Sequence, residues 1–88
     1  MKAIEKQNAN LIYSLIRQEI RDAYNQEEKE AIEKMLDLSI EEINNNPSEL
    51  KFANQLIRAE RNRIEKNIRK FGSNEKLESE LAFLNELI

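Results

Sequence analysis

Apolar residues recur at spacings of three and four along most of the chain, which is the period of an amphipathic helix and not the alternation of a strand. The pattern predicts helices over about 2–24, 26–44, 47–71 and 74–88. Connections this short make consecutive helices antiparallel neighbours. We therefore expect a single all-α domain over residues 1–88, folded as an antiparallel up-down-up-down four-helix bundle with short loops.

The predicted helix boundaries coincide with Asn, Pro and Gly. Asn25 and Asn46 each stand three residues before a Glu, and side chains at this spacing can satisfy the free amides of a first helical turn. Pro47 then occupies the first helical position, where a missing N–H donor costs nothing. Gly72, the only glycine, is a natural left-handed residue after a helix, and one of the next two residues caps the last helix.

The second predicted helix has one apolar face along its whole length. Its end is expected in the three asparagines at 44–46, which are poor helix residues and favour turns. The polar Ser39 is interpreted as part of this continuous face. The face consists of Ala31, Ile32, Met35, Leu36, Ser39, Ile40 and Ile43.

The composition is that of a folded domain in which positive and negative charges nearly balance. The chain is 40% hydrophobic and 35% charged, with a net charge of -3. These values argue against a disordered acidic tail and against a dedicated nucleic-acid binder. Because there is no Cys, stability must come from packing and capping, and we expect a cytoplasmic protein. The sequence has no run resembling a signal peptide or a membrane span.

The residue types present leave little room for catalysis. With no His and no Cys, the sequence lacks Ser-His triads, Cys nucleophiles and zinc ligands, and one Gly cannot form a phosphate-binding loop. Acidic residues crowd the second predicted helix, but a domain this small has no deep groove for a pair of catalytic carboxylates. We interpret them as a solvated face. We therefore predict that the protein is not an enzyme and has no metal site and no cofactor.

Basic residues gather on the third predicted helix. Residues 58–70 have a net charge of +4, whereas residues 26–43 have a net charge of -5. Two interpretations stay open: the two helices attract each other along their rims, or the basic face docks on an acidic protein surface or on anionic lipid at the inner membrane face. Nucleic acid is disfavoured because only Phe71 accompanies the basic residues. The candidate binding residues are Arg58, Arg61, Arg63, Lys66, Arg69 and Lys70.

Two further irregularities lie in the C-terminal half. Glu60 and Asn67 interrupt the apolar stripe of the third predicted helix, and we expect the Glu60 carboxylate to turn towards Arg63 or Arg61. The alternative is that this part of the helix faces a partner or a wet cleft. Phe83 and Leu87 widen the apolar arc of the last helix beyond one packing face, so they are added to the candidate partner-binding residues.

The order of these segments resembles the enterocin A immunity family, small four-helix proteins that protect bacteriocin producers from their own class IIa peptide. The resemblance rests on the opening helix at 11–16, the acid-led helix at 26–33, and the Ile-Glu-Glu-Ile-Asn-Asn-Asn-Pro turn at 40–47. It continues in the Leu-Ile-Arg at 56–58 and the leucine-bearing close at 81–87.

This resemblance implies a bacteriocin immunity protein on the cytoplasmic side of the membrane. Such a protein recognises the bacteriocin bound to its sugar-transporter receptor and blocks the resulting leak. Specificity in the family is associated with the C-terminal half, which corresponds here to the basic third helix and the apolar fourth helix.

Two other functions remain open from the sequence. One is a phage- or plasmid-encoded helical inhibitor or antitoxin that binds a soluble host protein. The other is an adaptor that forms a homodimer through its last helix. The first would copurify with a soluble target and not with a membrane transporter, and the second would lose its dimer when charges replace Phe83 and Leu87.

Overall fold

The computed structural model describes residues 2–88, and all the regular structure in that range is helical. The predicted all-α class is confirmed. Five α-helices are present, with one 3₁₀ turn before the first (η1, Lys6–Asn8) and another between the second and third (η2, Lys34–Asp37). The helices are α1 (Ala9–Asp22), α2 (Gln26–Glu33), α3 (Ile40–Asn45), α4 (Pro47–Phe71) and α5 (Glu75–Leu87).

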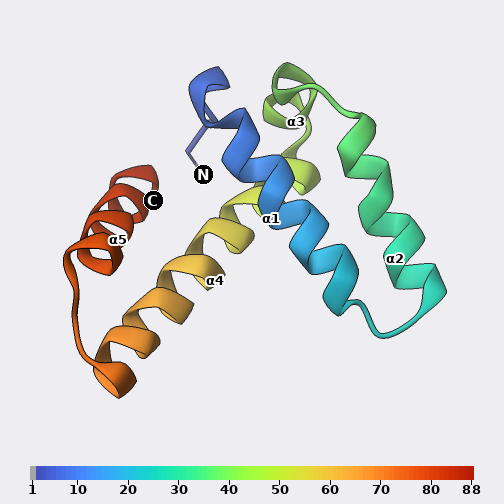
Figure 1. Ribbon diagram of the computed structural model, residues 1–88. Coiled ribbons are helices and arrows are strands. Elements are labelled where there is room, and N and C mark those ends of the chain that lie inside the picture. Colours follow the sequence, from blue (N-terminus) through green and yellow to red (C-terminus); the bar gives the residue numbers. More distant parts are fainter. Residues whose placement is uncertain (1) are drawn as a thin grey trace.

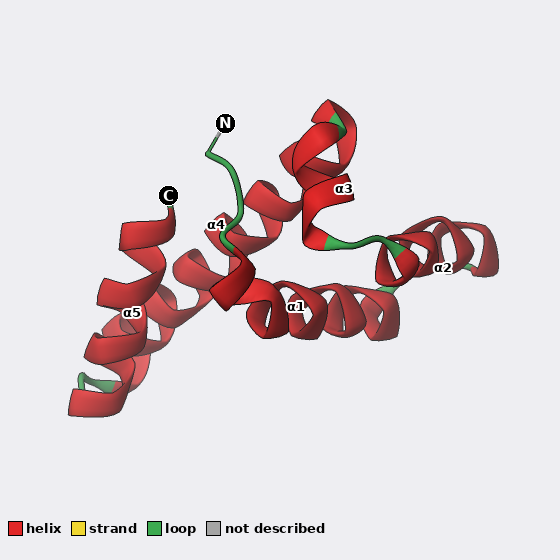
Figure 2. Ribbon diagram, turned by 90° about the horizontal axis from the view of Figure 1, so that it is seen from above, coloured by secondary structure: helices red, strands yellow, loops and turns green. Residues whose placement is uncertain are grey.

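The long helix α4 crosses α1 at the centre of the molecule (Figure 1). Helix α2 folds back beside α1, α5 folds back beside α4, and the short α3 packs on the beginning of α4. In both views α2 and α5 lie on opposite sides of the crossing (Figures 1 and 2). The molecule is only 18 Å thick in its shortest dimension, about two layers of helix. The predicted four-helix up-down-up-down bundle is therefore not confirmed.

The core lies at this crossing and reaches outward along α2 and α5. Four isoleucines from α1, α3 and α4 are almost completely buried, and each contributes about 1.5–3 kcal/mol by leaving water. They are Ile12, Ile16, Ile43 and Ile57. Ile32 and Met35 extend the core under α2 and η2, and Leu84 extends it under α5.

The predicted helix over 26–44 is interrupted. Leu38 is extended, and Ser39 caps α3 where the prediction had a continuous apolar face. The Ser39 hydroxyl accepts a hydrogen bond from the Glu42 N–H at 3.1 Å, and the Glu42 carboxylate accepts one from the Ser39 N–H at 3.3 Å. This reciprocal capping box satisfies two amides of a first turn. The Tyr13 hydroxyl of α1 also donates to the Leu38 carbonyl, so the interruption is bonded to the rest of the fold.

The first predicted helix is shorter than expected at both ends. Residues 2–5 are not helical, because Ile4 is buried and its backbone bonds to the side chain of Asn44 in α3. The Ile4 N–H donates to Asn44 Oδ1 at 2.7 Å, and Asn44 Nδ2 donates to the Ile4 carbonyl at 2.8 Å. At the other end α1 stops at Asp22, and Tyr24, which was predicted to lie in the apolar stripe, is 96% exposed.

The other predicted boundaries agree with the structure to within a residue or two. Asn25, Asn46 and Asn74 accept hydrogen bonds from first-turn amides of α2, α4 and α5. Pro47 is the first residue of α4. Gly72 has the predicted positive φ (92°), but its ψ of 162° is extended and not left-handed helical, a combination that only glycine adopts readily.

Candidate functional site

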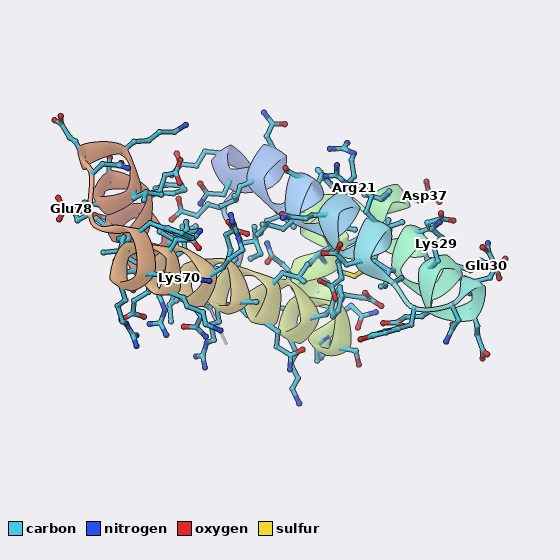
Figure 3. All side chains as sticks on the ribbon, turned by 60° about the horizontal axis from the view of Figure 1, so that its bottom comes forward. Arg21, Lys29, Glu30, Asp37, Lys70 and Glu78 are labelled. Atoms are coloured by element: carbon cyan, nitrogen blue, oxygen red, sulfur yellow. The ribbon has the colours of Figure 1, made fainter. Side chains whose placement is uncertain are left out.

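The basic residues of α4 lie far from the acidic helix α2. Lys70 and Glu78 lie at one end of the molecule, while Lys29 and Glu30 of α2 lie at the other (Figure 3). Helix α2 packs on α1, and the helix that accompanies the basic half of α4 is α5. Within residues 2–88 the ion pairs are Glu60–Arg63 and Glu65–Arg69, both internal to α4. The predicted rim pairing between the acidic and basic helices is therefore not found in the described residues.

Glu60 turns towards Arg63, as expected from its place in the apolar stripe. The Glu60 side chain is only 14% exposed and accepts a hydrogen bond from the Arg63 guanidinium. This hydrogen bond is the main cause of the raised pKa of Arg63; partial burial opposes it, and the nearby charges of Glu60 and Glu80 add smaller increases. The charged guanidinium is held by Glu60 of its own helix and also feels the charge of Glu80 in α5.

The six basic residues of the predicted cluster do not form one face. Arg61 is half-buried and donates to its neighbour Asn62. Arg63 points to the α1 side of α4, and Lys70 lies over the ring of Phe71, 5.4 Å from its centre. Arg58, Lys66 and Arg69 remain on the outer surface.

These three share the outer surface of α4 with exposed residues that the sequence analysis did not single out. The helical period brings Lys51, Gln55 and Asn62 into line with them. We call the line the cationic stripe: Lys51, Gln55, Arg58, Asn62, Lys66 and Arg69, all exposed and none acidic. Glu65, at its edge, is paired with Arg69 at 3.3 Å. Extending the three-and-four spacing backward from Arg58 would have found Lys51.

On its other side, α4 forms the floor of a groove between α1 and α5. We call it the Phe83 groove, after the half-exposed ring on its α5 wall, and it encloses about 330 Å³. Its apolar lining comprises Leu11, Leu15, Ile64, Phe83 and Leu84. Ser14, Gln18, Glu60, Arg63 and Glu80 provide the polar rim. The wet cleft considered for the middle of the third predicted helix thus exists beside the Glu60–Arg63 pair.

Phe83 and Leu87, which were predicted as one surface, differ in exposure, and of the two only Phe83 lines the groove. Phe83 is 45% exposed and also lines a second hollow next to the groove, between α5 and residues 2–8. Leu87 lines that second hollow but packs partly buried against the core. The partners of Phe83 on α1 were missed because Leu11 and Leu15 have the spacing of ordinary core residues.

No protein-family model, curated protein or solved structure matches the chain. The similarity to enterocin A immunity proteins therefore remains a prediction that rests on the segments in which it was noticed. Across residues 2–88 there is no cluster of three or more acidic side chains with the geometry of a metal site. None of the helices described combines the length and hydrophobicity needed to cross a bilayer.

Proposed function

We propose that the chain is a non-catalytic binding protein that recognises a protein partner through the Phe83 groove. The observation that carries the proposal is the half-exposed Phe83 ring above an open apolar floor. A small domain with no binding role would gain stability by closing α5 over α1 and burying this ring.

The groove has the composition of a recognition surface for side chains of a partner helix. Its apolar floor can accept one or two apolar anchors, and aromatic residues in such positions often dominate binding energy. The Glu60–Arg63 pair and Glu80 on the rim offer charged and hydrogen-bonding groups beside the floor. A partner with an apolar stripe flanked by polar residues fits this arrangement.

In its most specific form, the proposal is a bacteriocin immunity protein that acts on the cytoplasmic side of the membrane. The support for this form is the resemblance to the enterocin A immunity family, whose C-terminal half is associated with specificity. The floor and the Phe83 wall of the groove belong to that half, as does the basic part of α4, while α1 contributes the other wall. The partner would then be the transporter that serves as bacteriocin receptor, with its bound peptide.

The test is protection of a bacteriocin-sensitive strain that expresses the chain, measured against a panel of class IIa peptides. We expect protection against at least one peptide, and at least a tenfold loss of protection with Phe83→Ser. The matched control is Tyr24→Ser, because Tyr24 is also an exposed aromatic but lies at the α1–α2 turn. Absence of protection against every peptide would reject the immunity function.

A second candidate, a homodimeric adaptor, is favoured by one observation. Within residues 2–88, two of the four exposed large apolar residues, Phe83 and Ile88, belong to α5 or directly follow it. Sedimentation of the wild type beside Phe83→Glu tests this candidate, because a dimer that rests on this surface should dissociate in the variant. A monomeric wild type at high concentration rejects it.

A further inference from the structure

The outer face of α4 points away from the Phe83 groove, and its stripe residues are exposed in the described part of the chain. Its six exposed stripe positions run from Lys51 to Arg69, about 27 Å at 1.5 Å per residue. The other acidic residues of α4, Glu49 and Glu60, lie on its inner side and are half-buried. Four cations therefore face solvent along one straight line, and only one of them, Arg69, has an acidic partner.

One exposed apolar residue stands beside this line. Ile88 is 38% exposed and lines a shallow hollow with Lys2, Lys51 and Arg58. Cations beside an exposed apolar residue are typical of surfaces that lie on lipid headgroups.

We propose that the cationic stripe, with Ile88, docks this protein on an anionic lipid bilayer surface. The lysines and arginines would face lipid phosphates, and Ile88 would enter the headgroup region beside Lys51 and Arg58. This inference is independent of the proposed function, since the Phe83 groove lies on the other side of α4.

Charge and composition favour lipid over nucleic acid as the occupant. Nucleic-acid recognition of comparable strength relies on many phosphate contacts or on aromatic residues interleaved with the basic ones. The chain has a net charge of -3, and the stripe contains no aromatic residue. A flat charged bilayer needs only one face of the protein, and each cation near such a surface adds about 1 kcal/mol.

The binding test uses sedimentation with vesicles of phosphatidylcholine alone or mixed with phosphatidylglycerol, at low ionic strength. The stripe variant is Lys51→Gln, Arg58→Gln, Lys66→Gln. Its matched control, Arg17→Gln, Arg21→Gln, Lys34→Gln, removes three exposed cations on α1 and η2 and leaves the same net charge. Circular dichroism verifies that both variants fold.

We expect binding to anionic vesicles only, weakened about 100-fold in the stripe variant and at most severalfold in the control. Raising the ionic strength should release the bound protein. The inference is overturned by no binding to anionic vesicles, by equal losses in the two variants, or by tighter binding to a duplex oligonucleotide than to the vesicles.

A second measurement tests the orientation. Because the chain has no Trp, a single tryptophan can be placed at Ile88 or at Tyr24, both of which are exposed. We expect the emission of Ile88→Trp to shift to shorter wavelength with anionic vesicles, while Tyr24→Trp stays unchanged. A shift in Tyr24→Trp alone would place the membrane on the opposite end of the molecule and overturn the assignment.

Discussion

The segment 26–45 and the helix α4 contain the same local signal and treat it differently. Ser39 stands three residues before Glu42, and Asn62 stands three residues before Glu65. The first pair forms a capping box that starts a new helix, whereas α4 continues through the second without a break. A capping signature thus allows a helix to start at that point, but it does not by itself end the helix in which it occurs.

The difference lies in what else the side chains and the neighbouring backbone can bond. In α4, Asn62 accepts hydrogen bonds from Arg61, and Glu65 pairs with Arg69, so neither side chain caps a turn. At the break between η2 and α3, the Tyr13 hydroxyl donates a hydrogen bond to the Leu38 carbonyl. Tertiary contacts therefore select which of the two signals becomes a helix end.

A proline at each of the two positions should give the largest contrast. Asn62→Pro removes a hydrogen bond in the interior of α4 and clashes with the preceding turn, which should cost at least about 3 kcal/mol. Ser39→Pro should cost only about 1–2 kcal/mol, because Ser39 has a φ of -74° that proline can adopt and follows an extended residue.

Urea unfolding followed by circular dichroism measures both free energies of unfolding. Asn62→Ala controls for loss of the amide and should remain within about 0.5 kcal/mol of the wild type. Equal costs at the two positions would mean that the interruption at Ser39 is not a true helix end.

The hydrogen bonds between the Asn44 side chain and the Ile4 backbone should have the next largest effect on the free energy of unfolding. Asn44→Ala leaves the Ile4 N–H and carbonyl without their partner, and we expect a loss of about 2 kcal/mol in the free energy of unfolding. Asn54→Ala is the comparator in α4, since Asn54 makes a single exposed bond to the Lys2 carbonyl in addition to its helical contact. A loss from Asn54→Ala as large as that from Asn44→Ala would contradict the assignment.

Removal of the capping box should have a smaller effect. Ser39→Ala should lower the free energy of unfolding by about 1 kcal/mol, because the Glu42 amide loses its acceptor. In a double-mutant cycle with Glu42→Ala, the two losses should add up to more than the loss in the double variant. Strict additivity would show that the two side chains do not act as one cap.

The smallest effect is expected in α4. Glu65→Gln removes the exposed ion pair with Arg69 and should change the free energy of unfolding by only about 0.3–0.5 kcal/mol. It also tests whether the charge of Glu65 keeps α4 continuous past Asn62. Loss of helical signal in this variant would mean that the ion pair suppresses a break.

Local sequence signals predicted the parts of the fold that depend on hydrogen bonds between residues close together in the sequence. Asn46, Pro47 and Gly72 defined α4 because each acts on its own first or last turn. The interruption at Ser39 and the extended residues 2–5 were not predictable, since they depend on Tyr13 and Ile4, which bond to residues 25 and 40 positions away. No pattern along the chain contains those pairings.

The candidate surfaces divide in the same way. The cationic stripe follows from helical spacing on one element, and three of its four cations were in the predicted cluster. The Phe83 groove requires knowing that α1 and α5 flank the same side of α4. Phe83 was identified from the sequence as surplus apolar surface, but its neighbours Leu11 and Ile64 were not predictable from the sequence.

The arrangement around α4 has a consequence for how the molecule opens in solution. Helices α1, α3 and α5 all pack on α4, while α2 is joined to the rest chiefly through α1 and η2. Ile32 is the one buried residue of α2, so opening this helix should occur at a lower free energy than global unfolding. Amide hydrogens of α2 should therefore exchange with solvent well before those in the middle of α4. Helices α4 and α5, which contain the cationic stripe and Phe83, should remain folded while α2 opens.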